Sequence, residues 1–248
     1  MERVIDALAE ETRLSKASAI KFKLLLIEML RLLKKKYSYR ELSKITNVPE
    51  TVLCRYVRGT MVPSLEQALS IWRKISSFLD IRKLVEEKTR ITKHGYVDTA
   101  YVISDPYFLK LFGLYVYYYF HNKGVTKILT VATDGIPLAT MVSSIMEAPL
   151  VIAKQHKDDP DAEYIEETVY VPLSSTATLY VRKDMLTRKD NVLVVDDFLR
   201  SGRTLRALAG IILKARARPV GAVALVSVGS RWKGILEPVY SLFHVEIE

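Results

Sequence analysis

Residues 192 to 204, with the sequence VLVVDDFLRSGRT, carry the side chains best suited to chemistry in this chain. The first four are apolar, which is typical of a buried strand, and Asp196 and Asp197 follow directly. Carboxylates at the C-terminal end of a parallel strand lie where open α/β sheets bind ligands, and they can accept hydrogen bonds from a vicinal diol. The turn that follows offers backbone N–H groups and the hydroxyls of Ser201 and Thr204, which suit a phosphate group.

The two acids alone admit a second interpretation, in which they end a strand and cap a helix while Gly202 serves the turn. The whole segment, however, resembles the phosphoribosyl pyrophosphate signature of type I phosphoribosyltransferases: four apolar residues, two acids, two apolar residues and a small-residue phosphate loop. The resemblance implies binding of phosphoribosyl pyrophosphate or a nucleotide, with Mg2+ held through the ligand's phosphates. The ligand-binding residues that it implies here are Asp196, Asp197, Arg200, Ser201, Gly202, Arg203 and Thr204.

This phosphate loop departs from the family at two positions. Arg200 stands where the family usually has a small residue, and Arg203 where it often has glycine. Neither change removes the backbone N–H groups that suit a phosphate. The run Phe198-Leu199-Arg200 resembles the corresponding loop of the purine-operon-repressor-like members, which are regulators built on the same fold.

Two earlier segments resemble further parts of the family's site. The segment LTVATDGIPLA at 129 to 139 is similar to the pyrophosphate loop, which implies that Thr133, Asp134, Gly135 and Ile136 lie beside the pyrophosphate. Asp134 is an unfavourable neighbour for an anion unless Mg2+ or another cation lies between them. The segment VIAKQHK at 151 to 157 resembles the strand and basic loop from which a lysine, here Lys154, reaches the pyrophosphate; the alternative is an ordinary surface lysine.

The pattern beyond Tyr96 alternates apolar, β-branched runs with helical segments. Strands are expected at Lys127–Thr133, Leu150–Gln155, Asn191–Asp197 and Val220–Gly229, and helices at Pro106–His121, Ile136–Met146 and Gly202–Ala217. Near-continuous apolar strands interleaved with helices indicate an α/β fold with a doubly wound parallel sheet. We therefore expect a phosphoribosyltransferase-like domain over residues 91–248, preceded by an all-helical domain over 1–90.

The helical domain contains a segment, RELSKITNVPETVLCRYVRGTMVPS at 40 to 64, that resembles the helix-turn-helix of the lambda-repressor-like family. Asn47 takes the turn position that requires a left-handed backbone, Pro49 leaves the second helix without a hydroxyl cap, and Gly59 ends that helix. A helix at Ala19–Lys36 precedes this segment, and one capped by Ser64 with Gln67 follows. The expected apolar face of the first helix is Ile20, Leu24, Ile27, Leu30, and Leu33 or Leu32. The expected core of the helix-turn-helix is Leu42, Val48, Val52 or Leu53, and Tyr56.

The resemblance to a helix-turn-helix implies contacts with double-stranded DNA. The second helix would direct Glu50, Thr51, Cys54 and Arg55 to base edges, while Arg40, Lys44 and Arg58 would contact phosphates. Charge supports this interpretation, because residues 1–90 hold 19 Lys and Arg against 11 Asp and Glu, and residues 91–248 hold 18 against 17. The alternative is a helical protein-interaction or dimerisation module.

Bulk properties limit the class of protein. The chain has 248 residues, enough for one large domain or two modest ones, and its 49% hydrophobic content supports a buried core. Its apolar runs are too short to span a membrane. Cys54 is the only cysteine, so no intramolecular disulfide can form. The absence of a signal-peptide pattern leads us to expect a cytoplasmic protein.

Two functions remain open at this level, and a third, a DNA-binding scaffold with a vestigial empty fold, is disfavoured because the phosphate loop retains Ser201, Gly202 and Thr204. The first is a transcription regulator, expected to be a homodimer, that senses phosphoribosyl pyrophosphate or a nucleotide in one domain and binds DNA with the other. The second is an active purine or pyrimidine phosphoribosyltransferase that carries a regulatory domain. Family enzymes keep a mobile lid where residues 158–181 are acidic at first and then Ser/Thr-rich. A catalytic lid is expected to carry basic residues, which favours the regulator.

Overall fold

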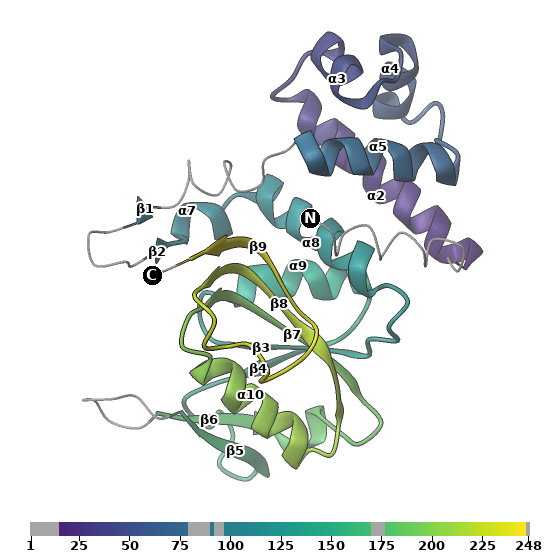
Figure 1. Cartoon of the computed structure of the whole chain (residues 1–248). Helices are drawn as coiled ribbons and strands as arrows, with labels where there is room; N and C mark the ends of the chain where they lie inside the picture. Colours follow the sequence, from purple (N-terminus) through teal and green to yellow (C-terminus); the bar gives the residue numbers. More distant parts are fainter. Residues whose placement is uncertain (1–14, 79–89, 92–96, 170–176, 247–248) are drawn as a thin grey trace. The chain divides into compact units, whose positions relative to one another are not determined.

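The computed structural model describes residues 15–78, 90–91, 97–169 and 177–246, shown in colour in Figure 1. The chain divides into two compact units, Met1–Glu87 and Lys88–Glu248. This division falls beside the boundary at residue 90 that the sequence suggests, where residues 79–89 and 92–96 lie outside the described part. The first unit contains helices α2 (Lys16–Lys34), α3 (Tyr39–Thr46), α4 (Glu50–Arg58) and α5 (Leu65–Phe78).

The helix ends of the first unit follow the local sequence closely. Asn47 is left-handed with φ of 55°, and it ends α3 as expected. Gly59, also left-handed with φ of 75°, ends α4, and Pro49 provides no side-chain cap for that helix. The Ser64 hydroxyl accepts a hydrogen bond from the Gln67 N–H at 3.1 Å, while the Gln67 side chain accepts one from the Ser64 N–H at 3.0 Å. These findings confirm the expected ends of α3 and α4 and the expected cap of α5. Helix α2, expected at Ala19–Lys36, instead runs from Lys16 to Lys34.

The buried face of α2 differs from the expected one. Ile20 and Leu24 are 55% and 51% exposed. The buried residues are Phe22, Leu26, Ile27, Met29, Leu30 and Leu33. Residues two apart on a helix point in nearly opposite directions, so placing Phe22 and Leu26 in the core turns Ile20 and Leu24 outward. The expectation of an apolar face through Ile20 and Leu24 was therefore wrong.

The small core of the helix-turn-helix matches its expected residues in part. Leu42, Leu53 and Tyr56 are at most 1% exposed. Val48 and Val52 are only partly buried, so Leu53 rather than Val52 fills the core. Arg31 of α2 donates from Nε to the Val57 carbonyl at 2.8 Å and ties the end of α4 to the first helix.

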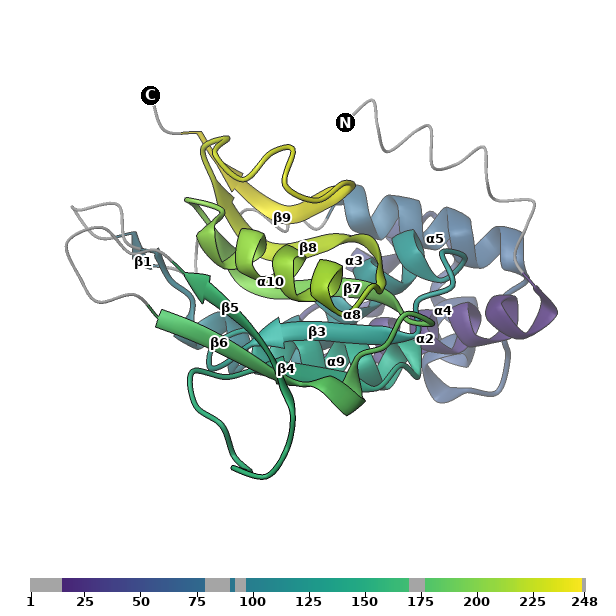
Figure 2. The same ribbon diagram turned by 90° about the horizontal axis from the view of Figure 1, so that it is seen from below.

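The second unit is built on a five-stranded sheet in the order β4-β3-β7-β8-β9. All neighbouring pairs in it are parallel. The strands are β3 (Lys127–Val131), β4 (Leu150–Ala153), β7 (Asn191–Leu199), β8 (Arg218–Val228) and β9 (Val239–Val245). Helix α10 (Arg203–Lys214) covers one face, while α8 (Pro106–Phe120) and α9 (Ile136–Met146) lie on the other (Figure 2). The doubly wound parallel sheet is therefore confirmed.

Strand β9, at one edge of this sheet, was not expected from the sequence. Its sequence VYSLFHV interrupts the apolar run with Ser241 and His244 and so lacks the continuous pattern of the inner strands. The unit also contains β1 (Arg90–Ile91), β2 (Val97–Asp98), the short helix α7 (Ala100–Ile103) and a 3₁₀ turn at Lys183–Met185. None of the described helices is both long and apolar enough to cross a membrane.

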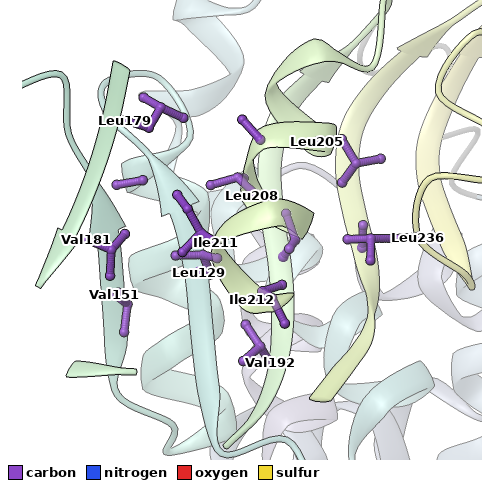
Figure 3. Packing of buried hydrophobic residues seen from close by; sticks show 14 of the residues in the cluster. Leu129, Val151, Leu179, Val181, Val192, Leu205, Leu208, Ile211, Ile212 and Leu236 are labelled. Carbon is purple, nitrogen blue, oxygen red and sulfur yellow. The ribbon is translucent and has the colours of Figure 1, made fainter. Parts of the chain in front are cut away.

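The core on the α10 side of the sheet explains why this helix lies where it does. Leu205, Leu208, Ile211 and Ile212 of α10 are buried against the strands. In Figure 3, Ile211 lies beside Leu129 and Ile212 lies close to Val192, while Leu205 lies on the side of Leu236. This packing fixes the start of α10, and hence the turn that precedes it, at the C-terminal end of β7.

The stretch in which family enzymes keep a lid contains an antiparallel hairpin of β5 (Tyr164–Val169) and β6 (Ala177–Arg182). The Ser/Thr-rich part at 174–176 lies outside the described residues. Four acids of this stretch form ion pairs with lysines: Asp158 with Lys154, Glu163 with Lys183, Glu166 with Lys157, and Glu167 with Lys214. Their charges are therefore neutralised within the unit.

Candidate functional site

A cavity of about 390 Å³ lies where β3 and β7 end. Seven residues expected at the ligand site line it: Thr133, Asp134, Gly135, Asp196, Asp197, Arg200 and Thr204. Two loops far apart in the sequence thus meet at one edge of the sheet, as parallel topology requires. Because Asp98, Asp134, Asp196 and Asp197 all line it, we call it the acidic cavity.

The two adjacent carboxylates of β7 have different surroundings. Asp196 is 5% exposed, and one oxygen, Oδ1, accepts a hydrogen bond from the Asp197 N–H at 3.1 Å. Burial raises the pKa of the Asp196 carboxyl well above its ordinary range, and the charge of Asp197 acts in the same direction. Burial also raises the pKa of Asp197, helped by the charge of Asp134 and opposed by a hydrogen bond from Thr99. A cation or a hydrogen-bond donor entering the cavity would therefore be attracted by several oxygens at once.

Gly135 brings the loop after β3 close to these carboxylates. A Cβ at this position would lie 2.5 Å from Thr130 Oγ1 and 3.2 Å from Asp196 Oδ1. The Thr130 hydroxyl is fully buried and has no hydrogen-bond partner among the described residues. Only glycine allows the loop this approach, so the expectation that Gly135 belongs to the site has a steric basis.

Two polar residues of the cavity were missed by the sequence analysis. Thr99 donates from Oγ1 to Asp197 Oδ2 at 3.1 Å, across 98 positions of the chain. Asp98 also lines the cavity, and its side chain accepts a hydrogen bond from the Ala100 N–H at 3.0 Å. Asp98 thus binds the first N–H of α7, whereas the N-cap residue Thr99 makes no side-chain cap and donates to Asp197 instead. Nothing local indicates that α7 begins beside β7.

The phosphate loop itself, residues 200–204, divides between two cavities. Ser201 and Arg203 do not line the acidic cavity but line an adjoining one of about 890 Å³, and Arg200 lines both. Gly202 begins α10 with φ of 71°, and a Cβ there would lie 2.9 Å from Trp232 Cα and 2.5 Å from Ile235 Cδ1. Gly202 therefore serves the turn and the packing of the loop rather than facing either cavity.

Lys154 has a different neighbour from the one expected. Its Nζ donates to Asp158 Oδ2 at 2.7 Å, and it is not among the residues that line the acidic cavity. The predicted role of Lys154 beside a pyrophosphate would require this exposed ion pair to open. It stays a prediction.

The residues expected to contact DNA lie on the first unit. Arg40, Lys44, Glu50, Thr51, Arg55 and Arg58 are exposed, whereas Cys54 is only partly exposed. Burial and a hydrogen bond with Cys54 raise the pKa of Tyr39, so the thiol also contacts α3. Exposure of the charged residues leaves them available to a polyanion, and their contacts with DNA stay a prediction.

The acidic residues do not form a metal site of their own. Within the described ranges, no three His, Cys, Asp or Glu side chains are arranged to hold a metal ion. The donor set of the acidic cavity nevertheless suits a divalent cation that arrives with an anionic ligand. Four carboxylates line that cavity, and Arg200 is the single cationic side chain among its lining residues.

Comparison with known proteins gives a consistent result. Residues 113–248 match the family described as phosphoribosyl transferase domain. The purine biosynthesis transcriptional activator PurR of Lactococcus lactis is 23% identical over 175 residues, which cover 70% of this chain and 65% of that protein. The chain thus spans slightly less than two thirds of that relative's length.

Enzymes of the same family are also similar. Xanthine phosphoribosyltransferase of Oceanobacillus iheyensis is 33% identical over 158 residues, 59% of this chain and 81% of the enzyme. Among solved structures, adenine phosphoribosyltransferase from Rhodothermus marinus superposes with a TM-score of 0.59 at 19% identity, covering 66% of this chain and 98% of the other. At that identity the likeness establishes the fold alone.

Proposed function

This chain belongs to the phosphoribosyl transferase domain family, and from this premise we propose that it is a DNA-binding transcription regulator that senses phosphoribosyl pyrophosphate or a nucleotide. The observation that carries the proposal is the pairing, in one chain, of the acidic cavity with a separate helical unit. That unit's α3 and α4 follow the helix-turn-helix pattern, with Asn47 left-handed between them. A relative matched over 70% of the chain is named as a transcription regulator, which supports it.

Recognition of the ligand would rest on the carboxylates of β7 and the loop that follows. Asp196 and Asp197 would accept hydrogen bonds from the two ribose hydroxyls, since charged acceptors bind hydroxyls strongly. The backbone N–H groups after Asp197 and the Thr204 hydroxyl would hold the 5′-phosphate at the start of α10. Lys154 would reach a pyrophosphate only after leaving Asp158.

Mg2+ fits this cavity as a partner of the ligand. A pyrophosphate beside Asp134 would be repelled by the carboxylates that line the cavity. A divalent cation carried on the ligand's phosphates neutralises that charge when bound. Asp134, Asp196 and Asp197 would attract the complex, directly or through water, without forming a complete protein metal site.

Binding to DNA would use the exposed end of α4. Thr51 and Arg55 would face base edges in the major groove, with Glu50 and Cys54 beside them, while Arg40, Lys44 and Arg58 contact phosphates. A twofold homodimer would present two such helices to a palindromic site. Binding of the ligand would then change the affinity for DNA, and binding of DNA would change the affinity for the ligand by the same factor.

The test is fluorescence anisotropy of the full chain on a labelled fragment from upstream of its own gene, at fixed salt, with competitor DNA. We expect specific binding that phosphoribosyl pyrophosphate with Mg2+ shifts by about fivefold or more. In Asp196→Asn with Asp197→Asn the shift should vanish while DNA binding persists. In Arg55→Ala the preference over competitor should fall. Equal affinity for the fragment and competitor, with and without ligand, would contradict the proposal.

The second candidate is an active phosphoribosyltransferase, which the 33% identity to a xanthine phosphoribosyltransferase favours. It would join a nucleobase to C1 of the ribose with loss of pyrophosphate. Pyrophosphate release measured with xanthine, adenine and pyrimidine bases tests it directly. Release with one base that is abolished by Asp196→Asn with Asp197→Asn would establish the enzyme.

A further inference from the structure

A second cavity, of about 890 Å³, lies on the other side of the phosphate loop. The loop and the first residue of α10 contribute Arg200 and Arg203, and the connection between β8 and β9 contributes Arg231 and Lys233. Glu246 is the single carboxylate among its lining residues. We call this space the basic cavity. It includes both residues at which the loop departs from the family's usual pattern.

Among the described residues that line the basic cavity, positive charge exceeds negative charge, with four cationic side chains and one carboxylate. Within the described part of the chain, none of its four cationic side chains forms an ion pair. The lysines around the β5–β6 hairpin differ, since Lys157, Lys183 and Lys214 each pair with a glutamate. Four cations and one carboxylate around one concavity leave an excess of positive charge, which attracts anions.

The walls of the basic cavity are held by buried contacts. Gly202 packs against Trp232, which keeps the β8–β9 connection on the phosphate loop. His244 lines the cavity, and its Nδ1 lies 2.8 Å from the Ser227 hydroxyl, which in turn lies 2.7 Å from that of Ser241. Ser227 is fully buried. The imidazole orientation is therefore set before any ligand arrives.

We propose that the basic cavity binds the phosphates that follow the 5′-phosphate of a nucleotide, so that the preferred ligand is a nucleoside 5′-diphosphate or 5′-triphosphate. This inference rests on the proposed ligand site. A ribose held by Asp196 and Asp197 places its 5′-phosphate at the phosphate loop, and that loop forms one wall of the basic cavity. Arg200 lines both cavities and therefore lies between the ribose site and the basic cavity. A neutral nucleobase would leave the cationic charge uncompensated, whereas two further phosphates offset most of it.

The test compares nucleotides that differ in phosphate number alone. Calorimetry of the full chain in EDTA, at low and high salt, would measure AMP against ATP and GMP against GTP. We expect each triphosphate to bind at least about tenfold more tightly than its monophosphate. This ratio of affinities should be smaller at high salt. In Arg231→Gln with Lys233→Gln the ratio should fall below about threefold while monophosphate affinity stays within about twofold.

A matched control is available at the other end of the sheet. Arg188 and Lys189 are exposed just before β7 begins. The variant Arg188→Gln with Lys189→Gln removes one arginine and one lysine charge, as the test variant does. This variant should keep the wild-type ratio. A ratio near one in the wild type, or a ratio that survives Arg231→Gln with Lys233→Gln, overturns the inference.

The same variants separate this inference from its premise. If the Arg231 and Lys233 substitutions weaken mono- and triphosphates equally, the cavity holds another part of the ligand and the inference is wrong. If they weaken DNA binding alone, the cavity is a nucleic-acid contact and the inference is also wrong. Phosphoribosyl pyrophosphate with Mg2+ is titrated in parallel. If it binds but triphosphates bind no more tightly than monophosphates, the inference is rejected and the proposed ligand site is retained. Binding of neither it nor any nucleotide rejects the proposed ligand site as well.

Discussion

The acidic and basic cavities share one loop and carry opposite charge. Asp98, Asp134, Asp196 and Asp197 line the first, and the second has four cationic side chains and one carboxylate. The difference arises because β7 delivers its carboxylates to one side of residues 200–204, while α10 and the β8–β9 connection deliver cations to the other. On the proposal made above, an anion would enter the first cavity only together with a cation, whereas the second cavity would bind it without one. Four predictions test this contrast.

The largest effect is expected from removing the two carboxylates of β7. Asp196→Asn with Asp197→Asn should weaken phosphoribosyl pyrophosphate with Mg2+ by about 100-fold or more, because charged acceptors contribute about 1.5–3 kcal/mol each. Calorimetry would measure it, with circular dichroism to check the fold. Inorganic tripolyphosphate, which lacks the ribose, should bind as in the wild type. Unchanged affinity for phosphoribosyl pyrophosphate would reject the acidic cavity as the ribose site.

The next effect concerns the loop that both cavities share. Gly202→Ala forces a left-handed residue and a Cβ 2.9 Å from Trp232 Cα, so we expect a loss of about 2–4 kcal/mol in the free energy of unfolding. Gly234→Ala is the matched control, since Gly234 has φ of 76° with nothing within 4 Å of a Cβ, and it should cost only about 1–2 kcal/mol. Urea denaturation measures both. Equal losses would mean that the packing of Trp232 on the loop contributes nothing.

A smaller effect is expected at Lys154. If Lys154 moves from Asp158 to the pyrophosphate, Lys154→Ala should weaken phosphoribosyl pyrophosphate by about tenfold, or roughly 1.4 kcal/mol. Stability should change by less than about 1 kcal/mol, because the ion pair is exposed. Lys183→Ala removes a similar pair, with Glu163 at 2.8 Å, and should leave ligand affinity unaltered. Equal affinities in the two variants would exclude Lys154 from the site.

The smallest effect is on stability without ligand. Burial raises the pKa of Asp196, so the folded protein binds more protons than the unfolded chain, and stability falls as pH rises from about 3.9 through the raised value. Asp196→Asn should therefore raise Tm at pH 7.5 and change it less at pH 4, as scanning calorimetry would show. Asp184→Asn should have the opposite effect and lower Tm at pH 7.5, since pairing with Arg182 lowers the pKa of Asp184. A Tm difference independent of pH would contradict this account.

Sequence reasoning succeeded where the interactions are local. The helix ends at Asn47 and Gly59, the cap at Ser64, and the strand-turn-helix around Asp196 depend on residues within a few positions of one another. It failed where a choice depended on distant packing. Both Val52 and Leu53 suit a core position, and only the packing of three helices selects Leu53. The apolar residues of α2 likewise permit two faces, and burial of Phe22 decides between them.

The sequence alone therefore determined the parallel α/β fold, the helical unit and half of the residues that line the acidic cavity. Those features follow from periodicity, turn residues and one contiguous segment. The tertiary structure decided that Thr99 reaches Asp197, that Lys154 pairs with Asp158, and that Arg231 and Lys233 face the same cavity as Arg203. These residues come from separate strands and loops, and the order of strands in the sheet sets the distances between them. No local pattern encodes that order, so opposite charge on the two sides of one loop emerges only when the sheet is assembled.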